Sequence, residues 1–220
     1  MLILKNRMPY SIYRELLLNN NGDPFLPKLT QIQSYIKYRR TKNGDINSIE
    51  GLDDFIRDKL YSNINLQDLD DDEPFYFGEE INNGSDENHF HLGITSKTLL
   101  KNMFHGLTFL FDCTYKIVKY GFPLIVFCCS DLEHKFYPIL FFITSHEQEN
   151  DFNFFWNSLL DVCKLLNNDL INSIRFICSD ADRAIANSIK KNLENSTLIM
   201  CWFHLTANLS FFYLDKLKIN

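Results

Sequence analysis

Long apolar runs, a Cys-x-x-Cys pair and an excess of positive charge are all missing from this sequence of 220 residues. The longest apolar stretches, 124–129 and 139–143, are far shorter than the roughly 18 residues that a membrane helix needs, so we expect no membrane span. Lys5 and Arg7 follow a very short apolar start, which is the wrong order for a secretory signal. We therefore expect the protein to stay inside the cell.

The cysteines all lie in the second half of the chain, mostly inside apolar runs. They are Cys113, Cys128, Cys129, Cys163, Cys178 and Cys201. Such positions are typical of small buried hydrophobic side chains. Without a Cys-x-x-Cys pair, we expect reduced thiols rather than a disulfide framework.

The charge of the chain is moderately negative, with 22 basic and 28 acidic side chains and a formal net charge of −6. A nucleic-acid-binding protein is expected to show a basic footprint, so the total argues mildly against one. One stretch without acidic residues contains Lys28, Lys37, Arg39, Arg40 and Lys42. It is either a solvated helix face or a surface for contacts with DNA phosphates.

Composition and spacing divide the chain into three parts. Apolar residues recur every three or four positions in residues 1–65, which predicts a small helical N-terminal segment. Residues 66–96 contain the acidic run DLDDDE, Pro74 and an Asn/Gly/Ser-rich stretch, which are the signals of a linker. The remaining residues, 97–220, are expected to form one larger domain.

Short apolar runs in the larger domain predict three strands at 107–113, 124–130 and 136–143. Pro138 cannot donate a ladder hydrogen bond, which predicts that the third strand lies at a sheet edge. A long helix with a wide apolar stripe, a strand, a helix, a strand and a final helix follow, between residue 145 and the end of the chain. This order predicts an α/β fold with a mixed five-stranded sheet flanked by helices, the ribonuclease H-like plan, in which the fourth strand lies beside the first.

Two aspartates interrupt apolar strands in this scheme. Asp112 interrupts the first strand and Asp180 ends the fourth, so neighbouring strands would bring both carboxylates to one divalent ion. Other interpretations remain open, since Asp112 is also suited to a turn and Asp180 to a helix N-cap. Asp182 competes with Asp180 for a role as metal ligand.

Cys201 and His204 form a Cys-x-x-His pair where the last strand meets the final helix. One helical turn would let the thiolate and the imidazole face the same way, and zinc accepts both. A structural zinc site needs about four ligands, and no second pair of similar spacing is present. A buried cysteine beside a core or capping histidine is the favoured interpretation.

Several stretches of the chain resemble the transposase domain of Mutator-like elements, the MULE family of DDE transposases. The resemblance covers roughly residues 97–216 and rests on ITSKTLLKNM, FDCTYKIVKYGFPLIVF, HKFYPILFFITSHEQENDF, ICSDADRAIANSIKKNL and CWFHL. It implies a ribonuclease H-like core, with Asp112 and Asp180 as catalytic metal ligands and Cys201 with His204 as the family signature. The reaction that it implies is phosphoryl transfer on DNA with two divalent ions, Mg²⁺ or Mn²⁺.

The chain also departs from the pattern of this family. The family's third acidic residue, a glutamate, lies well beyond the Cys-x-x-His pair, whereas this chain stops at Asn220. The resemblance therefore predicts a defective or truncated transposase core when this chain acts alone.

Two other functions are also compatible with the sequence. A transposase-derived protein without catalytic activity would bind DNA or act as a regulator through the basic stretch that includes Lys37, Arg39, Arg40 and Lys42. A ribonuclease H-type nuclease would prefer an RNA–DNA hybrid. By family habit the partners are transposon ends, target DNA and further copies of the chain, and a DNA substrate implies a nuclear location.

Overall fold

A computed structural model describes residues 9–19, 26–42, 49–115, 117–118, 121–165, 171 and 174–206. The chain divides at Phe55 and Ile56 into two units, residues 1–55 and residues 56–220. Among the described residues, no helix is long and apolar enough to cross a membrane.

The first unit contains the predicted helices α1 (Pro9–Asn19) and α2 (Leu29–Lys42). Their apolar residues form a small cluster in which Ile12, Ile32 and Ile36 are buried. A third helix, α3 (Ile49–Ile56), ends at the boundary between the units. The helical character expected for this part of the chain is therefore confirmed for the described residues.

The second unit is built on a mixed sheet of seven strands. In chain order these strands are β1 (Phe75–Glu80), β2 (His91–Thr95), β3 (Thr108–Thr114), β4 (Leu124–Ser130), β5 (Phe136–Thr144), β6 (Phe176–Ser179) and β7 (Thr197–Met200). Their order across the sheet is β1-β2-β5-β4-β3-β6-β7. The pairs β3–β6 and β6–β7 are parallel, and all other pairs are antiparallel. The predicted neighbours β3 and β6 do lie side by side.

The prediction of five strands is wrong, because β1 and β2 extend the sheet to seven. Both strands lie within residues 66–96, where the sequence indicated a loop. They are short, and the Asn/Gly/Ser-rich stretch lies between them, so their alternation is hard to recognise. Phe75 and Phe77 are fully buried and anchor β1 in the core of the second unit.

The prediction that β5 forms a sheet edge is also wrong, because β2 pairs with its outer side through Phe141, Phe142, Ile143 and Thr144. Pro138 lies outside that paired stretch. On the other side of β5 it faces Cys128, where the β4–β5 register shifts. The missing N–H of Pro138 is thus accommodated by an irregularity in the ladder rather than by an edge.

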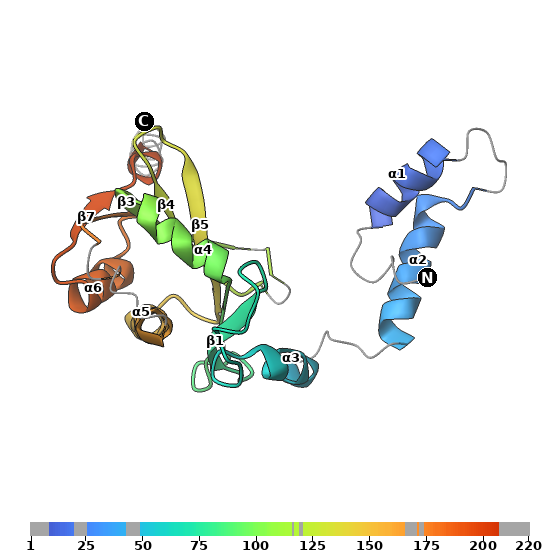
Figure 1. Cartoon of the computed structure of the whole chain (residues 1–220), viewed down its shortest axis with the longest axis horizontal. Coiled ribbons are helices and arrows are strands. Elements are labelled where there is room, and N and C mark those ends of the chain that lie inside the picture. Colours follow the sequence, from blue (N-terminus) through green and yellow to red (C-terminus); the bar gives the residue numbers. More distant parts are fainter. Residues whose placement is uncertain are drawn as a thin grey trace, which may run out of the picture. The chain divides into compact units, whose positions relative to one another are not determined.

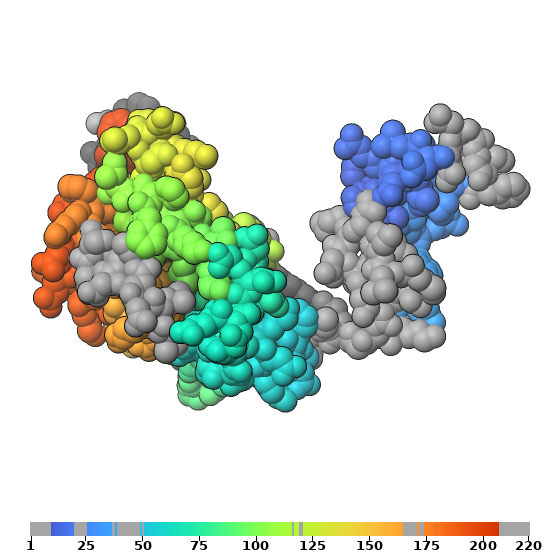
Figure 2. Space-filling model, in the orientation of Figure 1, coloured from blue at the N-terminus to red at the C-terminus, as the bar shows by residue number. Residues whose placement is uncertain are grey.

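Six further helical segments complete the described part of the second unit (Figure 1). They are η1 (Arg57–Lys59), α4 (Lys97–Lys101), η2 (Asn102–His105), α5 (Glu149–Leu165), α6 (Arg183–Asn192) and a short helix at 202–206. The space-filling view shows the green residues of α4 and η2 against the yellow hairpin of β4 and β5, in agreement with their contacts (Figure 2). The helices α5 and α6 pack against each other on one face of the sheet.

An aromatic cluster joins the sheet to these two helices. Trp156 of α5 is fully buried, and its ring centroid lies 5.5 Å from the centroids of Phe111 in β3 and Phe127 in β4. Its indole N–H donates a hydrogen bond to the hydroxyl of Ser188 in α6, at 3.3 Å. The wide apolar stripe predicted for α5 therefore does face the sheet, where it packs on β3 and β4.

Candidate active site

The register between β3 and β6 brings the two predicted aspartates together. Phe109 pairs with Ile177 and Leu110 with Cys178. Carried two residues further along both strands, this register places Asp112 beside Asp180. Residues at matching positions of neighbouring strands project from the same face of a sheet, about 4.8 Å apart along the hydrogen-bond direction. Both carboxylates therefore lie at the carboxyl end of the parallel pair.

Asp112 is a strand residue, and the alternative of a turn does not apply. It belongs to β3 and pairs with Val126 of β4. Phe111 packs against the rings of α5, so alternation along the strand directs Asp112 away from that helix. Its side chain is exposed, which leaves it open to a ligand.

Asp182, and not Asp180, caps the helix that follows β6. The Asp182 carboxylate accepts hydrogen bonds from the N–H groups of Ala184 and Ile185, at 2.7 and 3.1 Å, at the first turn of α6. Asp180 accepts one hydrogen bond, from the N–H of Asp182 at 3.2 Å. The capping role that competed for Asp180 is thus filled by its neighbour, which leaves most of the Asp180 carboxylate available.

Glu147 is a further carboxylate at this end of the sheet, and sequence analysis missed it. Along the ladders, Thr114 pairs with Leu124 and Leu124 with Ile143, so the end of β5 is level with the end of β3. Glu147 leaves the sheet just beyond that point, in the connection to α5. The only sequence signal was a polar segment between a strand and a helix, which is common in any α/β fold.

The electrostatics of Glu147 connect it to the aspartates. Partial burial raises its pKa, a hydrogen bond with the Cys113 thiol acts in the opposite direction, and the negative charges of Asp180 and Asp182 raise the pKa further. Burial likewise raises the pKa of Cys113, with Glu147, Asp112 and Asp180 adding to the shift. These interactions mark one acidic neighbourhood, in which Cys113 stays a neutral thiol.

Cys201 and His204 lie next to this neighbourhood. The N–H of Cys201 donates to the carbonyl oxygen of Ser179 at 2.7 Å, which places Cys201 beside the end of β6. The thiols of Cys178 and Cys201 are hydrogen-bonded, and Nδ1 of His204 is buried without a hydrogen-bond partner in the described structure. In the described ranges, no cluster of three metal-ligating groups includes this pair.

The basic stretch lies in the first unit. Lys37, Arg39, Arg40 and Lys42 belong to the backbone of α2, and their side chains fall outside the described residues. Their contact with DNA therefore stays a prediction.

Comparison with known families finds a match, which lies in the second unit. Residues 108–208 match the family model of the MULE transposase domain. These residues are similar to the MULE transposase domain. The match begins at the first residue of β3, and it includes Asp112, Asp180, Cys201 and His204. No curated protein matches the chain.

The family resemblance seen in the sequence is thereby confirmed. A MULE transposase domain implies a transposase-related function, DNA as the general class of partner, and the use of divalent metal ions. Strands β1 and β2 lie outside the matched residues, although they belong to the same sheet.

Proposed function

We propose that this chain provides a catalytic-core fragment of a DDE-type DNA transposase, a class of enzymes that cleave and join DNA strands by metal-dependent phosphoryl transfer. The observation that carries the proposal is the matching position of Asp112 and Asp180 on the neighbouring parallel strands β3 and β6. Their location also agrees with the general rule that α/β sheets bind ligands beyond the carboxyl ends of their parallel strands. Both residues lie in the matched domain.

The sheet order supports a ribonuclease H-like core within this larger sheet. Strands β5, β4, β3, β6 and β7 follow one another in the order that this plan requires, with β6 next to β3. The strands β1 and β2 then form an addition at the β5 side. In this interpretation β1 and β2 support β5 and leave open the end of β3 and β6 where Asp112 and Asp180 lie.

The residues present fit a hard divalent cation. Carboxylate oxygens are preferred ligands of Mg²⁺ and Mn²⁺, and the exposed side chain of Asp112 leaves room for water and phosphate oxygens. Asp112 and Asp180 would hold the ions, two of them by family habit, and Glu147 offers a third carboxylate nearby. When bound, such ions activate the attacking oxygen and stabilise the leaving oxygen.

The protein's own groups keep the carboxylates available for that role. Asp182 accepts two N–H groups at the start of α6, so Asp180 is not needed as the helix N-cap. The Cys113 thiol donates its hydrogen bond to Glu147 and stays protonated, since burial and the surrounding carboxylates raise its pKa. It therefore orients Glu147 without acting as a nucleophile, and no covalent protein intermediate is needed.

The chain has a formal net charge of −6, so binding of DNA needs a local group of basic side chains. We propose that Lys37, Arg39, Arg40 and Lys42 of α2 contact phosphates, because Arg and Lys supply most of the affinity for the backbone of DNA. Transposon ends and target DNA are the proposed partners, a homo-oligomer the proposed assembly, and the nucleus the proposed location.

The proposal is tested by a strand-cleavage and strand-joining assay of the full chain with Mg²⁺ or Mn²⁺. We expect Asp112→Asn and Asp180→Asn to reduce the rate by at least about 100-fold through loss of metal binding. Asp161→Asn is a matched control, since Asp161 is exposed on α5 and forms an ion pair with Lys164 on the same helix.

Two other results would replace the proposal. Salt-dependent DNA binding that survives both aspartate variants, together with no cleavage by the wild type, indicates a transposase-derived DNA-binding or regulatory protein. Metal-dependent cleavage of an RNA–DNA hybrid in preference to duplex DNA indicates a ribonuclease H-type nuclease.

A further inference from the structure

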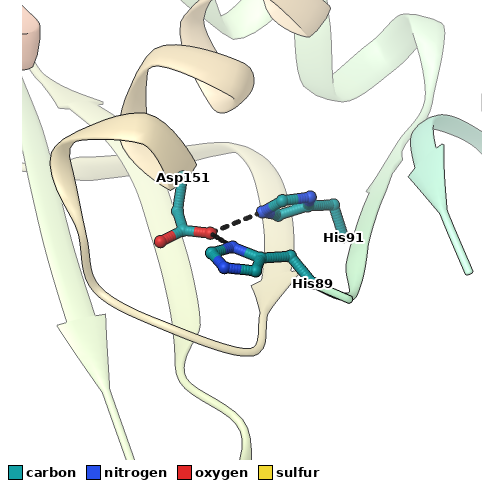
Figure 3. Close-up of side chains that lie close together, drawn as sticks. All are labelled: His89, His91 and Asp151. Carbon is teal, nitrogen blue, oxygen red and sulfur yellow. Dashed lines mark hydrogen bonds and ion pairs between the residues drawn. The ribbon is translucent and has the colours of Figure 1, made fainter. Parts of the chain in front are cut away.

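Two histidines and an aspartate meet at a place that the transposase function does not use. His91 lies in β2, His89 in the loop before it, and Asp151 in the first turn of α5 (Figure 3). One oxygen of Asp151, Oδ1, lies 2.6 Å from Nδ1 of His89 and 2.8 Å from Nε2 of His91. The three potential ligand atoms all lie within 4.8 Å of one another.

This cluster is separate from the carboxylates of the proposed active site. His91 pairs with Thr144 at the end of β5, and β5 and β4 lie between β2 and β3. Three strand spacings amount to about 14 Å. Residues 89 and 91 also precede the matched family domain, which begins at 108.

Burial makes the cluster costly unless all its polar atoms are paired. Asp151 is fully buried and His91 is 3% exposed, whereas 19% of the His89 side chain is exposed. A buried carboxylate without a compensating cation or donor is strongly unfavourable. The ring of His91 also stacks on Phe154, with 4.3 Å between the centroids, which fixes the direction of its nitrogens.

Each ring nitrogen of the two histidines faces an acceptor. Besides Asp151, His91 contacts Glu80, with 2.8 Å between Nδ1 and Oε2. His89 contacts the carbonyl oxygen of Asp86, with 3.2 Å between Nε2 and that oxygen. A neutral imidazole carries a single N–H, so it can donate to only one of its two acceptors. Two neutral histidines therefore leave two of the four contacts without a donor.

We propose that His89, His91 and Asp151 form a binding site for one divalent transition-metal ion of the zinc class. An ion between the three atoms would take the lone pairs of His89 Nδ1 and His91 Nε2 together with Asp151 Oδ1. The remaining N–H of His91 then donates to Glu80, and that of His89 donates to the carbonyl of Asp86. One ion thus satisfies all four contacts with both histidines neutral.

The groups around the three ligands are those of a metal site. A histidine that binds a metal through one ring nitrogen usually donates the N–H of its other nitrogen to a carboxylate or a backbone carbonyl. Here the carboxylate of Glu80 and the carbonyl oxygen of Asp86 would accept these hydrogen bonds. The second oxygen of Asp151 accepts the N–H of Gln148 at 3.0 Å, so the carboxylate is also fixed in place. Two imidazoles and one carboxylate suit Zn²⁺ and its neighbours better than Mg²⁺.

The site would link the added strands to the core. One ion would join β2 and its preceding loop to the start of α5, which carries the buried Trp156. Three protein ligands leave the fourth position of a tetrahedral ion to a ligand from outside the three side chains.

The test is a titration of the full chain with Zn²⁺ against a competing chelator, in excess Mg²⁺ so that the Asp112 region is occupied. We expect one zinc ion per chain. Asp151→Asn removes an anionic ligand and should weaken zinc binding by more than about 100-fold, and Glu80→Gln, outside the ligand shell, by about 10- to 100-fold. His134→Asn is the matched control, because His134 is exposed and its positive φ suits asparagine.

Cys201→Ser distinguishes the proposed site from the Cys-x-x-His pair, and it should leave zinc binding unchanged. Co²⁺ provides a second measurement on the wild type. Visible bands without a thiolate charge-transfer band indicate nitrogen and oxygen ligands. The proposal is overturned if the wild type binds no zinc, which would mean that protons alone occupy the cluster. It is equally overturned if Asp151→Asn and Glu80→Gln bind as tightly as the wild type, or if Co²⁺ shows thiolate ligation.

Discussion

Asp180 and Asp182 are two residues apart and have opposite expected roles, which allows a sharp double test. Asp182 accepts two N–H groups at the start of α6, at 2.7 and 3.1 Å. Loss of such a cap costs about 1 kcal/mol, and loss of a negative charge at a helix N-terminus adds about 0.3–1 kcal/mol. For Asp182→Ala we therefore expect a decrease of about 1–2 kcal/mol in the free energy of unfolding. In a unit of this size, that corresponds to a decrease of about 2–8 °C in Tm.

Asp180→Asn should behave in the opposite way. The asparagine side chain can still accept the N–H of Asp182, so the free energy of unfolding without metal should change by less than about 0.5 kcal/mol. The Asp180→Asn substitution also removes one of the two negative charges that Asp112 and Asp180 place at the end of the neighbouring strands β3 and β6. Metal binding, in contrast, should be lost. At an Mg²⁺ concentration ten times the Kd, a bound ion stabilises the native state by about 1.4 kcal/mol, and this increment should disappear in Asp180→Asn.

The assay is urea unfolding of each variant, followed by circular dichroism with and without Mg²⁺. Asp182→Ala should lower the stability equally in both conditions and keep the Mg²⁺-dependent increment. Asp180→Asn should keep the stability without Mg²⁺ and lose the increment. The reasoning is refuted if Asp182→Ala loses the increment while Asp180→Asn retains it, since Asp182 would then be the metal ligand and Asp180 the structural residue.

Three further predictions concern the packing that supports the site. Trp156→Ala should lower the free energy of unfolding by about 3–5 kcal/mol, because Trp156 is fully buried. Trp202→Ala, at a position 74% exposed, should change it by less than about 0.5 kcal/mol, and equal effects of the two variants in urea unfolding would contradict the packing described. Gly93→Ala should lower the free energy of unfolding by about 1–3 kcal/mol, because a Cβ at residue 93 would come within 2.5 Å of the buried Phe77 ring. An unchanged melting temperature would show that β1 and β2 do not pack in this way. Burial raises the pKa of Cys129 and of Cys163 to about 11, so alkylation of these thiols at pH 8 should be roughly 100-fold slower in the native protein than after denaturation. Mass spectrometry would measure both rates, and equal rates would show that the thiols are exposed.

The strands β3 to β7 and the helices α5 and α6 could be predicted because each has a strong periodic pattern. Strand β4, for example, alternates buried and half-buried residues along its whole length, and α5 carries its apolar residues on one stripe. Their order then limits the topology, because a helical crossover requires parallel pairing and a hairpin requires antiparallel pairing. The closeness of Asp112 and Asp180 follows from that topology.

Features that depend on partners distant in sequence could not be predicted in the same way. The strands β1 and β2 are stabilised by the fully buried Phe75 and Phe77, but polar residues between them dominate the local pattern. Pro138 was assigned to an edge because the sequence does not show where a ladder becomes irregular. Glu147, His89 and His91 lie in segments that look like ordinary loops until the strands are paired.

The connection between β5 and α5 joins the two candidate metal sites. On one side, Glu147 accepts the hydrogen bond of the Cys113 thiol and interacts with Asp180. On the other side, the next residue, Gln148, donates its N–H to Asp151, and Ser145 accepts the N–H of Phe90 at 2.9 Å. Both ends of this four-residue segment are thus tied to the region of His89 and His91. Because the segment is so short, groups that fix Asp151 also restrict the positions open to Glu147. The added strands of the sheet therefore contribute to the geometry of the acidic neighbourhood, although they lie outside the family domain.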